Sequence, residues 1–168
     1  NKNLFDGIKG EIIVKGDNVF KKYLNNKRKT NQVKKSGWLH TGDIGSFDKN
    51  KNLYIHDRID NMVVISGENV YPTEIEKFSN LIKNIKLSVV TSIPDPFTQN
   101  KLILLYESTK KIDENKILKV LLKKITNFKI PKKIIHCYEV GLNEIPKAPN
   151  GKILRSKVRE IVENYYKK

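Results

Sequence analysis

The segment from Met62 to Pro72 has the sequence MVVISGENVYP, and its pattern indicates the class of fold. It begins with a compact apolar run as far as Ile65, which is typical of a buried strand. Ser66 and Gly67 then predict a turn, and Pro72 suits the first turn of a helix. The apolar residues that follow keep helical spacing: Ile75, Phe78 and Ile82. We therefore expect a helix that packs one face on a sheet.

The sequence after this stretch continues to alternate strands with helices. Apolar runs at 87–92, 102–107 and 134–138 predict three strands. Asp113 is a good N-cap for a helix with one apolar face, and the apolar residues of 158–165 have the spacing of a final helix packed on a core. The sequence therefore predicts a mixed α/β domain with a central sheet and about three helices.

The N-terminal third of the chain has a different pattern, which is rich in β-strands. Residues 10–16 and 53–56 predict short strands, and the lysine-rich residues 27–36 between them predict a loop. The change of pattern places a boundary between an incomplete β-rich subdomain, 1–58, and a compact α/β domain, 59–168. A unit of fewer than about 60 residues buries little apolar surface, so we expect the first one to lack part of its core.

The net charge of +15 is the most prominent feature of the composition. Only four of the 33 basic residues are arginines, and the lysines are spread along the chain among many asparagines. Nucleic-acid grooves favour clustered arginine with stacking aromatic residues. We therefore expect no nucleic-acid partner, and a basic binding module without catalysis is kept only as an alternative.

Three other features limit the class of protein. The chain is 38% hydrophobic, enough for a packed core, but its longest apolar runs fall far short of the roughly 20 residues of a membrane span. The one cysteine, Cys137, excludes an internal disulfide and fits a reducing compartment. We expect a cytoplasmic protein without a transmembrane segment. The lack of an initiator methionine predicts a piece of a longer protein.

The first candidate site is Thr41-Gly42-Asp43. The glycine allows a tight backbone turn, and the aspartate carries a carboxylate on a short stem. One carboxylate can accept hydrogen bonds from two vicinal hydroxyls, which is what ribose recognition requires. The alternative is a plain Gly-Asp turn.

The second candidate site includes Arg58 and the segment around Gly67. The guanidinium of Arg58 is a planar fork of donors that suits phosphate or ribose oxygens. Gly67 predicts a loop that exposes backbone amides ahead of a helix. The alternative is an Asp-Arg surface pair followed by a hairpin turn.

The third candidate site is Lys152, in the segment 145–155, which has the sequence IPKAPNGKILR. Two prolines and a glycine restrict this loop, so the ammonium group is presented from a defined position. A fixed ammonium can neutralise the charge that develops during phosphoryl transfer. A solvated surface lysine is the alternative, and the full glycine spacing of a phosphate-binding P-loop is absent.

Taken in order, these segments resemble the C-terminal part of the AMP-forming adenylating enzymes. This superfamily includes acyl-CoA synthetases, peptide-synthetase adenylation domains and beetle luciferase, and the resemblance covers nearly the whole sequence. Residues 37–44 and 145–155 are most similar to fatty acyl-CoA and 4-coumarate-CoA ligases, and 65–72 to the long- and medium-chain acyl-CoA synthetases. Two departures are a loop at 95–101 that lacks the Gly-Glu common in relatives, and Ser66, where many have glycine.

The resemblance implies an acid-thiol ligase that works in two steps. A carboxylic acid, of the fatty-acid class, attacks the α-phosphate of Mg-ATP to give acyl-AMP and pyrophosphate, and the thiol of coenzyme A then displaces AMP. An enzyme of the same chemistry that loads a carrier protein is an alternative. In the family, the ATP phosphate loop, the acyl pocket and the magnesium ligands lie upstream, so we expect no metal site and no ligase activity from this fragment alone.

The resemblance also implies a role for each candidate residue. Asp43 would hold the ribose hydroxyls, and Arg58 would contact the ribose and phosphate side of the nucleotide. Asp60 would be the hinge about which residues 59–168, a mobile lid, rotate against the larger N-terminal domain whose distal end is 1–58. Lys152 would be the catalytic lysine of adenylation. Gly67, Glu68 and Asn69 would face coenzyme A during thioester formation.

Overall fold

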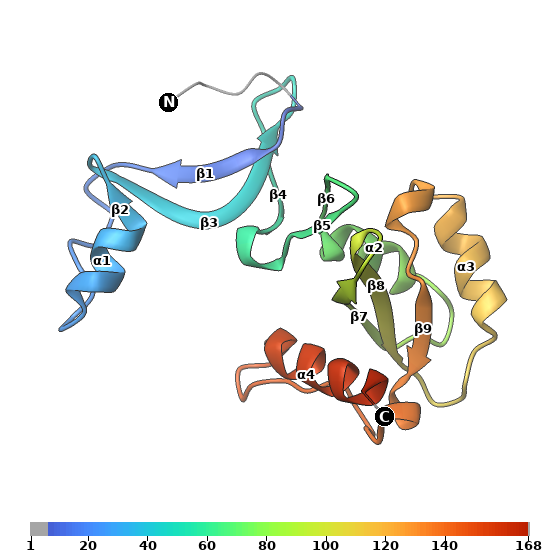
Figure 1. Cartoon of the computed structure of the whole chain (residues 1–168). Coiled ribbons are helices and arrows are strands. Elements are labelled where there is room, and N and C mark those ends of the chain that lie inside the picture. The colour runs from blue at the N-terminus through green and yellow to red at the C-terminus, as the bar shows by residue number, and fades with distance from the viewer. Residues whose placement is uncertain (1–6, 168) are drawn as a thin grey trace. The chain divides into compact units, whose positions relative to one another are not determined.

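The computed structural model describes residues 7–167 and divides into two compact units, of which the first ends at Asn61 and the second begins at Met62 (Figure 1). No helix in this described part of the chain is long and apolar enough to cross a membrane. The division of the sequence at residue 58 into an incomplete domain and a mobile lid stays a prediction.

The first unit contains an antiparallel sheet in which β3 is the central strand. Its elements are β1 (Gly10–Val14), the helix α1 (Lys27–Val33), β2 (Lys34–Lys35), β3 (Trp38–Phe47), β4 (Leu53–Arg58) and the 3₁₀-helix η1 (Ile59–Asn61). Strand β3 pairs with all three of the other strands, β1, β2 and β4. The strands predicted at 10–16 and 53–56 correspond to β1 and β4.

The lysine-rich residues 27–36, predicted to be a loop, instead contain helix α1. Asn26 caps this helix, since its Oδ1 accepts the amide of Lys29 at 2.9 Å. The hydroxyl of Thr30 accepts the amide of Tyr23 at 3.0 Å and so joins the helix to the segment before it. The helix buries none of its residues. It therefore lacks the apolar periodicity by which a helix is recognised in a sequence.

The described residues of the first unit form almost no buried core. Ile44 is their only buried hydrophobic side chain, and Asp57 is their only buried charged one. Several large apolar side chains of the sheet are exposed: Phe47, Leu53, Tyr54 and Ile55. A small sheet with so little buried apolar surface gains little stability from its own core. That the unit is incomplete stays a prediction.

The second unit is a mixed α/β domain, and the predicted central sheet and three helices are confirmed. Its elements are β5 (Val63–Ile65), β6 (Glu68–Val70), α2 (Pro72–Ser79), β7 (Leu87–Asp95), β8 (Gln99–Glu107), α3 (Glu114–Leu122), the 3₁₀-helix η2 (Asn127–Lys129), β9 (Lys133–His136), the 3₁₀-helix η3 (Cys137–Val140) and α4 (Arg155–Tyr166). Strands β5 and β6 form a hairpin. The main sheet has the order β7-β8-β9, with β7 antiparallel and β9 parallel to β8.

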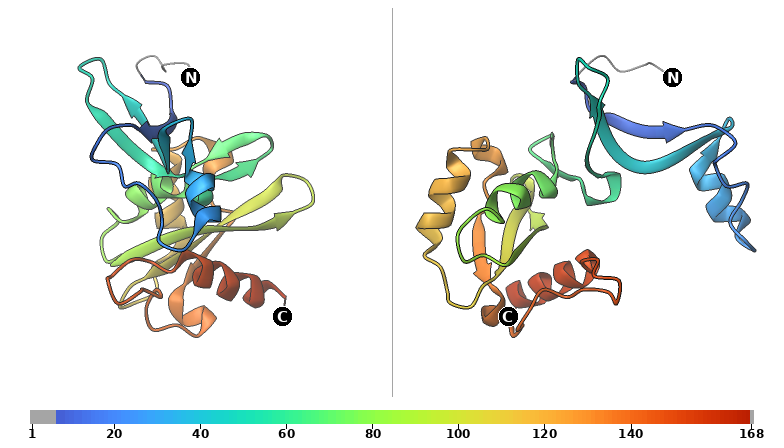
Figure 2. Two further views of the ribbon diagram at one scale, coloured as in Figure 1. Left: turned by 90° about the vertical axis from the view of Figure 1, so that its left-hand side faces the viewer. Right: turned by 180° about the vertical axis from the view of Figure 1, so that it is seen from behind.

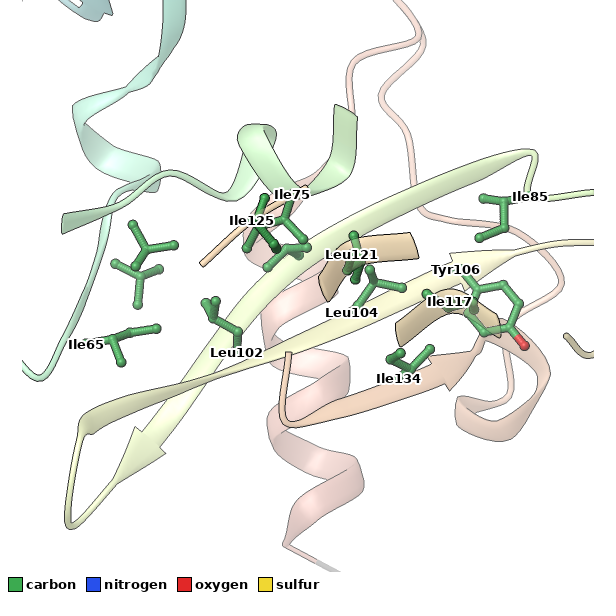
Figure 3. Packing of buried hydrophobic residues seen from close by; sticks show 13 residues of the cluster. Ile65, Ile75, Ile85, Leu102, Leu104, Tyr106, Ile117, Leu121, Ile125 and Ile134 are labelled. Carbon is green, nitrogen blue, oxygen red and sulfur yellow. The ribbon is translucent and has the colours of Figure 1, made fainter. Parts of the chain in front are cut away.

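Helices cover both faces of the main sheet (Figures 1 and 2). Alternate residues of β8 point to opposite faces, and Leu102, Leu104 and Tyr106 belong to the cluster that includes helices α2 and α3 (Figure 3). The helices contribute fully buried side chains to it: Ile75 from α2, with Ile117 and Leu121 from α3.

Helix α4 covers the other face. Ile103 and Leu105 of β8 pack there with Val158 and Val162 of α4, and Ile145 joins the same cluster from the loop before that helix. All five side chains are fully buried. The last helix predicted from 158–165 is therefore confirmed, and its first turn is fixed to the sheet close to Lys152.

Two local predictions have different outcomes. Asp113 caps α3 as predicted, because its Oδ1 accepts the amide of Asn115 at 3.0 Å. The strand predicted at 134–138 ends earlier, at His136, and Cys137 begins the 3₁₀-helix η3. The side chain of Glu139 accepts the amide of His136 at 2.9 Å, which closes the start of η3 in place of a further strand residue.

Candidate functional site

Residues 41–43 lie within β3 and form a bulge, not the chain reversal that a plain turn would give. On β1, Glu11 and Ile13 are two residues apart, whereas their partners on β3, Ile44 and His40, are four apart. The extra residues on β3 interrupt its hydrogen-bond ladder with β1 and change the direction of their side chains.

Glu11 of β1 holds this bulge from the neighbouring strand. Its Oε1 accepts the amide of Gly42 at 3.2 Å, and its Oε2 lies 2.7 Å from Nδ1 of His40. The hydroxyl of Thr41 donates to a backbone carbonyl of β1 at 2.7 Å and accepts the amide of Asp43 at 3.0 Å. The backbone that carries Asp43 is therefore fixed on both sides.

Asp43 and Arg58 are paired residues on β3 and β4, and their side chains meet. Nη1 of Arg58 lies 2.8 Å from Oδ1 of Asp43 and 3.4 Å from the carbonyl oxygen of Thr41. Oδ2 of Asp43 accepts no hydrogen bond from another described residue, 7–167. The carboxylate is 35% exposed, so it can accept hydrogen bonds from a ligand.

Glycine is favoured at position 42 for two reasons. Its φ of +73° lies in the left-handed region, which costs a side-chain-bearing residue about 1–2 kcal/mol. A Cβ atom there would also lie 2.8 Å from Nη2 of Arg58. The close approach of backbone and guanidinium therefore depends on Gly42.

Asp60 lies in η1, directly after Arg58, and its side chain is 83% exposed. Its Oδ2 lies 3.8 Å from Nη2 of Arg58. The buried carboxylate of Asp57 fixes this segment, because its Oδ1 accepts the amide of Arg58 at 2.7 Å and Nδ2 of Asn61 at 2.8 Å. The structure thus brings Asp43, Arg58 and Asp60 together at the end of the first unit.

Gly67, Glu68 and Asn69 belong to the β5–β6 hairpin of the second unit. Ser66 and Gly67 both have positive φ, +49° and +83°, as in the two-residue hairpin turn of type I′. Glu68 and Asn69 are exposed residues of β6, not of a loop. The hairpin turn, which was the alternative for this segment, is the arrangement observed.

A second hairpin, between β7 and β8, contacts the first. The amide of Ser66 donates to the carbonyl of Thr98 at 3.1 Å, and Nδ2 of Asn100 donates to the carbonyl of Val64 at 2.9 Å. Gln99 has a φ of +67° in the loop that lacks the Gly-Glu pair. The two departures from the family pattern, Ser66 and this loop, thus lie beside each other.

Lys152 lies in a short antiparallel turn, residues 146–154, directly before α4. The amide of Ala148 donates to the carbonyl of Lys152, and the amide of Gly151 to that of Ala148, both at 2.8 Å. Oδ1 of Asn150 accepts the amide of Lys152 at 3.2 Å. The lysine is exposed, and its ammonium has no ion-pair partner in the described part of the chain.

An ion pair that sequence reasoning missed lies three residues after Lys152. Nη1 and Nη2 of Arg155 donate to the two carboxylate oxygens of Glu76, each at 2.7 Å. Oε1 of Glu76 also accepts the amide of Val90 in β7 at 2.7 Å, and Glu76 is buried. Glu76 and Arg155 are 79 positions apart, so no local spacing could have indicated this pair.

Neither metal binding nor the one cysteine thiol adds a further functional site in the described part of the chain. Residues 7–167 contain no group of three or more His, Cys, Asp or Glu that could hold a metal ion. Burial, with a smaller contribution from the nearby Glu107 carboxylate, raises the pKa of the Cys137 thiol to about 12. Cys137 is therefore a core thiol and not a nucleophile.

No protein-family model matches the chain. It is, however, 33% identical over 152 residues to the long-chain-fatty-acid–CoA ligase FadD13 of Mycobacterium tuberculosis. It is 36% identical over 157 residues to the 2-succinylbenzoate–CoA ligase of Bacillus cereus. These alignments cover 90% and 92% of this chain but 29% and 31% of the relatives. The chain thus spans about 30% of the length of the curated relatives it matches.

Solved structures give the same result. The o-succinylbenzoate CoA synthetase MenE from Bacillus subtilis, in complex with the acyl-adenylate OSB-AMP, matches with a TM-score of 0.85 and 27% identity, over 92% of this chain and 31% of that one. ATP-bound MatB from Rhodopseudomonas palustris matches with a TM-score of 0.85 and 30% identity, over 97% of this chain and 32% of that one.

These matches first define the class: the fold is that of the C-terminal part of the adenylating enzymes. More particularly, the relatives named above are AMP-forming acyl-CoA ligases, and this chain matches their C-terminal part, which is about 30% of the length of each.

Proposed function

We propose that this protein is the C-terminal part of an ATP-dependent acyl-CoA synthetase, which activates a carboxylic acid of the fatty-acid class as acyl-AMP and transfers it to coenzyme A. The observation that carries the proposal is the similarity to acyl-CoA ligases over 90% or more of the sequence. A cytoplasmic location and packing on a larger N-terminal domain stay predictions.

The nucleotide is bound, in this proposal, through Asp43 and Arg58. The partly exposed carboxylate of Asp43 accepts the two ribose hydroxyls, and the guanidinium of Arg58 donates to the ribose and phosphate side. The support is geometric. Arg58 already holds one oxygen of Asp43, and the bulge fixes the backbone of the aspartate. Binding of a ligand therefore costs little conformational entropy in these two side chains.

Lys152 supplies the positive charge for adenylation. The attack of a carboxylate on the α-phosphate joins two anions, and a fixed ammonium stabilises the negative charge that builds up on the phosphoryl oxygens. The support is that Lys152 is exposed, has no ion-pair partner among residues 7–167, and extends from a turn with four internal hydrogen bonds. Magnesium ligands are expected upstream.

Thioester formation uses the hairpin of Gly67, Glu68 and Asn69, which lines the path of the pantetheine thiol. Asp60 is the pivot. If the backbone of Asp60 absorbs a rotation of the lid, the same lid can serve both steps of the reaction. The support is that Asp60 is exposed and that the division between the two compact units falls just after it, between Asn61 and Met62.

The test is Lys152→Ala in the longer enzyme that, in this proposal, includes these residues. Removing one preorganised charge should slow ATP–pyrophosphate exchange by about 10²–10³-fold. Thioester formation from supplied acyl-AMP should remain within about two-fold, because that step does not use the ammonium. The control is Lys147→Ala, which removes an exposed lysine from the same turn.

Wild-type exchange in Lys152→Ala, or equal loss in both variants, would contradict the proposal. Coenzyme A and a carrier-bound phosphopantetheine are compared as acceptors of the supplied acyl-AMP. Transfer only to the carrier would overturn the acyl-CoA synthetase assignment and leave the adenylating chemistry intact.

A further inference from the structure

The buried ion pair between Glu76 and Arg155 lies at the base of the turn that carries Lys152. Lys152 lies three positions before Arg155, a length of chain that spans at most about 11 Å. Arg155 is the first residue of α4, so its position sets where the turn 146–154 joins the helix. Whatever fixes Arg155 therefore limits where the ammonium of Lys152 can lie.

Glu76 fixes Arg155 by geometry as well as by charge. Both carboxylate oxygens accept from the guanidinium at 2.7 Å, which is a bidentate arrangement that sets the plane and direction of the arginine. The Glu76 side chain is 8% exposed and that of Arg155 is 25% exposed, so water weakens this pair less than an ion pair on the surface.

Glu76 is itself attached to the edge of the main sheet. Its Oε1 accepts the amide of Val90, and Oδ1 of Asn80, the residue that directly follows α2, accepts the amide of Ser88. Both amides belong to β7, the edge strand, where no further strand of the described residues pairs with them. Helix α2 and helix α4 pack on opposite faces of the sheet. The ion pair between Glu76 and Arg155 therefore connects the two faces around the edge formed by β7.

The turn has few other attachments. Its backbone hydrogen bonds run between its own residues, from Ala148 to Lys152, Gly151 to Ala148 and Leu154 to Pro146. Buried Ile145 anchors its start, and Ile153 packs against the same cluster. At the C-terminal side, the side chain of Arg155 is the polar anchor.

We propose that Glu76 and Arg155 are positioning residues of the adenylation step: the carboxylate of Glu76 holds Arg155, and Arg155 sets the position of the Lys152 ammonium. The inference rests on the proposed function of Lys152. A displacement of a charged group by about 1 Å costs up to 10²-fold in rate. Loss of the pair should therefore lower the rate of adenylation and leave thioester formation unchanged.

The experiment compares four variants of the longer enzyme: Glu76→Gln, Arg155→Lys, Lys152→Ala and the double variant Glu76→Gln/Lys152→Ala. Glutamine keeps an acceptor for the Val90 amide but loses the charge, and lysine keeps the charge but loses the bidentate fork. Both single variants of the pair should lower kcat of ATP–pyrophosphate exchange by about ten- to a hundred-fold with KM for ATP nearly unchanged. The control is Arg159→Gln, which breaks the exposed ion pair with Glu163 on the same helix.

The double variant separates positioning from general damage. If Glu76 acts through Lys152, the double variant should be no slower in adenylation than Lys152→Ala alone. Multiplied losses, or equal losses in adenylation and thioester formation, would overturn the positioning role. If Lys152→Ala slows exchange but the Glu76 and Arg155 variants do not, the positioning role fails alone. If Lys152→Ala has no effect, the proposed function fails first.

A second measurement applies if Glu76→Gln does not fold in the longer enzyme. In Arg155→Lys of the 168-residue protein, amide hydrogen exchange at Ala148 and Gly151 should be about ten-fold faster than in the wild type, because the end of the turn is less restrained. Exchange at Val70 in the β5–β6 hairpin should be unchanged. Unchanged exchange at Ala148 and Gly151 would mean that the ion pair does not hold the turn.

Discussion

Asp43 and Arg58 face each other across β3 and β4, with Nη1 of Arg58 2.8 Å from Oδ1 of Asp43. Both side chains are partly exposed, at 35% and 51%. An ion pair in that setting contributes about 0–1 kcal/mol to folding, so stability alone gives little reason for it. Its geometry instead keeps a carboxylate oxygen and a guanidinium side by side, where a nucleotide can bind to both.

Asp43→Asn should therefore affect nucleotide binding far more than stability. The amide keeps the shape but loses the charge and one acceptor, and we expect KM for ATP to rise by about ten-fold or more in the longer enzyme while Tm changes by no more than a few degrees. The control is Asp48→Asn in the β3–β4 turn, whose carboxylate accepts the amides of Asn50 and Asn52. A lowered Tm with unchanged KM in Asp43→Asn would show that the pair is only structural.

Gly67→Ala should destabilise the second unit through the backbone alone. Nothing lies within 4 Å of the added Cβ, but the φ of +83° costs an alanine about 1–2 kcal/mol in the free energy of unfolding. Urea unfolding followed by circular dichroism measures this change. The matched control is Ser66→Gly, which introduces a glycine at a φ of +49°. It should not lower the free energy of unfolding. Equal stability of wild type and Gly67→Ala would mean that the turn rearranges at no cost.

Much of the second unit could be predicted because its elements have amphipathic patterns. Helix α2 follows from Pro72 and the spacing of Ile75 and Phe78, and α3 follows from the Asp113 cap and its apolar face. Helix α1 could not be predicted, since it buries no side chain and depends on the cap at Asn26.

The candidate site shows the same limit. Thr41-Gly42-Asp43 and Lys152 have local sequence signals, whereas the partners that fix their surroundings are distant in the sequence. Glu11 reaches Gly42 across 31 positions, and Glu76 reaches Arg155 across 79. Such pairs depend on tertiary packing, and no periodicity in a single sequence encodes them.

Cys137 should resist alkylation in the folded protein. Its side chain is buried, and burial raises its pKa to about 12, so only about one thiol in ten thousand is ionised at pH 8. Iodoacetamide at pH 8 should leave the native protein unlabelled and label it fully in urea, as read by mass spectrometry. Rapid labelling of the native protein would show that the core around η3 opens readily.

The same thiol should make the protein less stable at alkaline pH. The ordinary thiol pKa is 9.0, so the unfolded state releases its proton first, and stability declines as pH rises from about 9 to about 12. Cys137→Ala should remove this part of the decline, at the cost of a lower stability at neutral pH. A decline of the same steepness in both proteins would assign it to other groups.

Asp95 should make the β7–β8 hairpin sensitive to acid. The backbone amide of Thr98, its hydroxyl and the amide of Phe97 all donate to Oδ1 of Asp95, and these bonds hold the pKa of the carboxyl below its ordinary 3.8. A carboxyl with a lowered pKa stabilises the folded state above about pH 3.8, and this contribution is lost as pH falls through the lowered pKa. Asp95→Asn should therefore flatten the loss of stability below pH 4, and Thr98→Val should flatten it in part.

Lowering the pH should first affect the β5–β6 turn, which the β7–β8 hairpin contacts. The carbonyl of Thr98 accepts the amide of Ser66 at 3.1 Å, so protonation of Asp95 loosens a contact of the β5–β6 turn. In the wild type, the amide resonance of Ser66 should shift with the same midpoint as the carboxyl resonance of Asp95, and in Asp95→Asn this shift should be absent. A Ser66 shift that persists in Asp95→Asn would mean that another group controls the turn, and the two hairpins would then respond to pH independently.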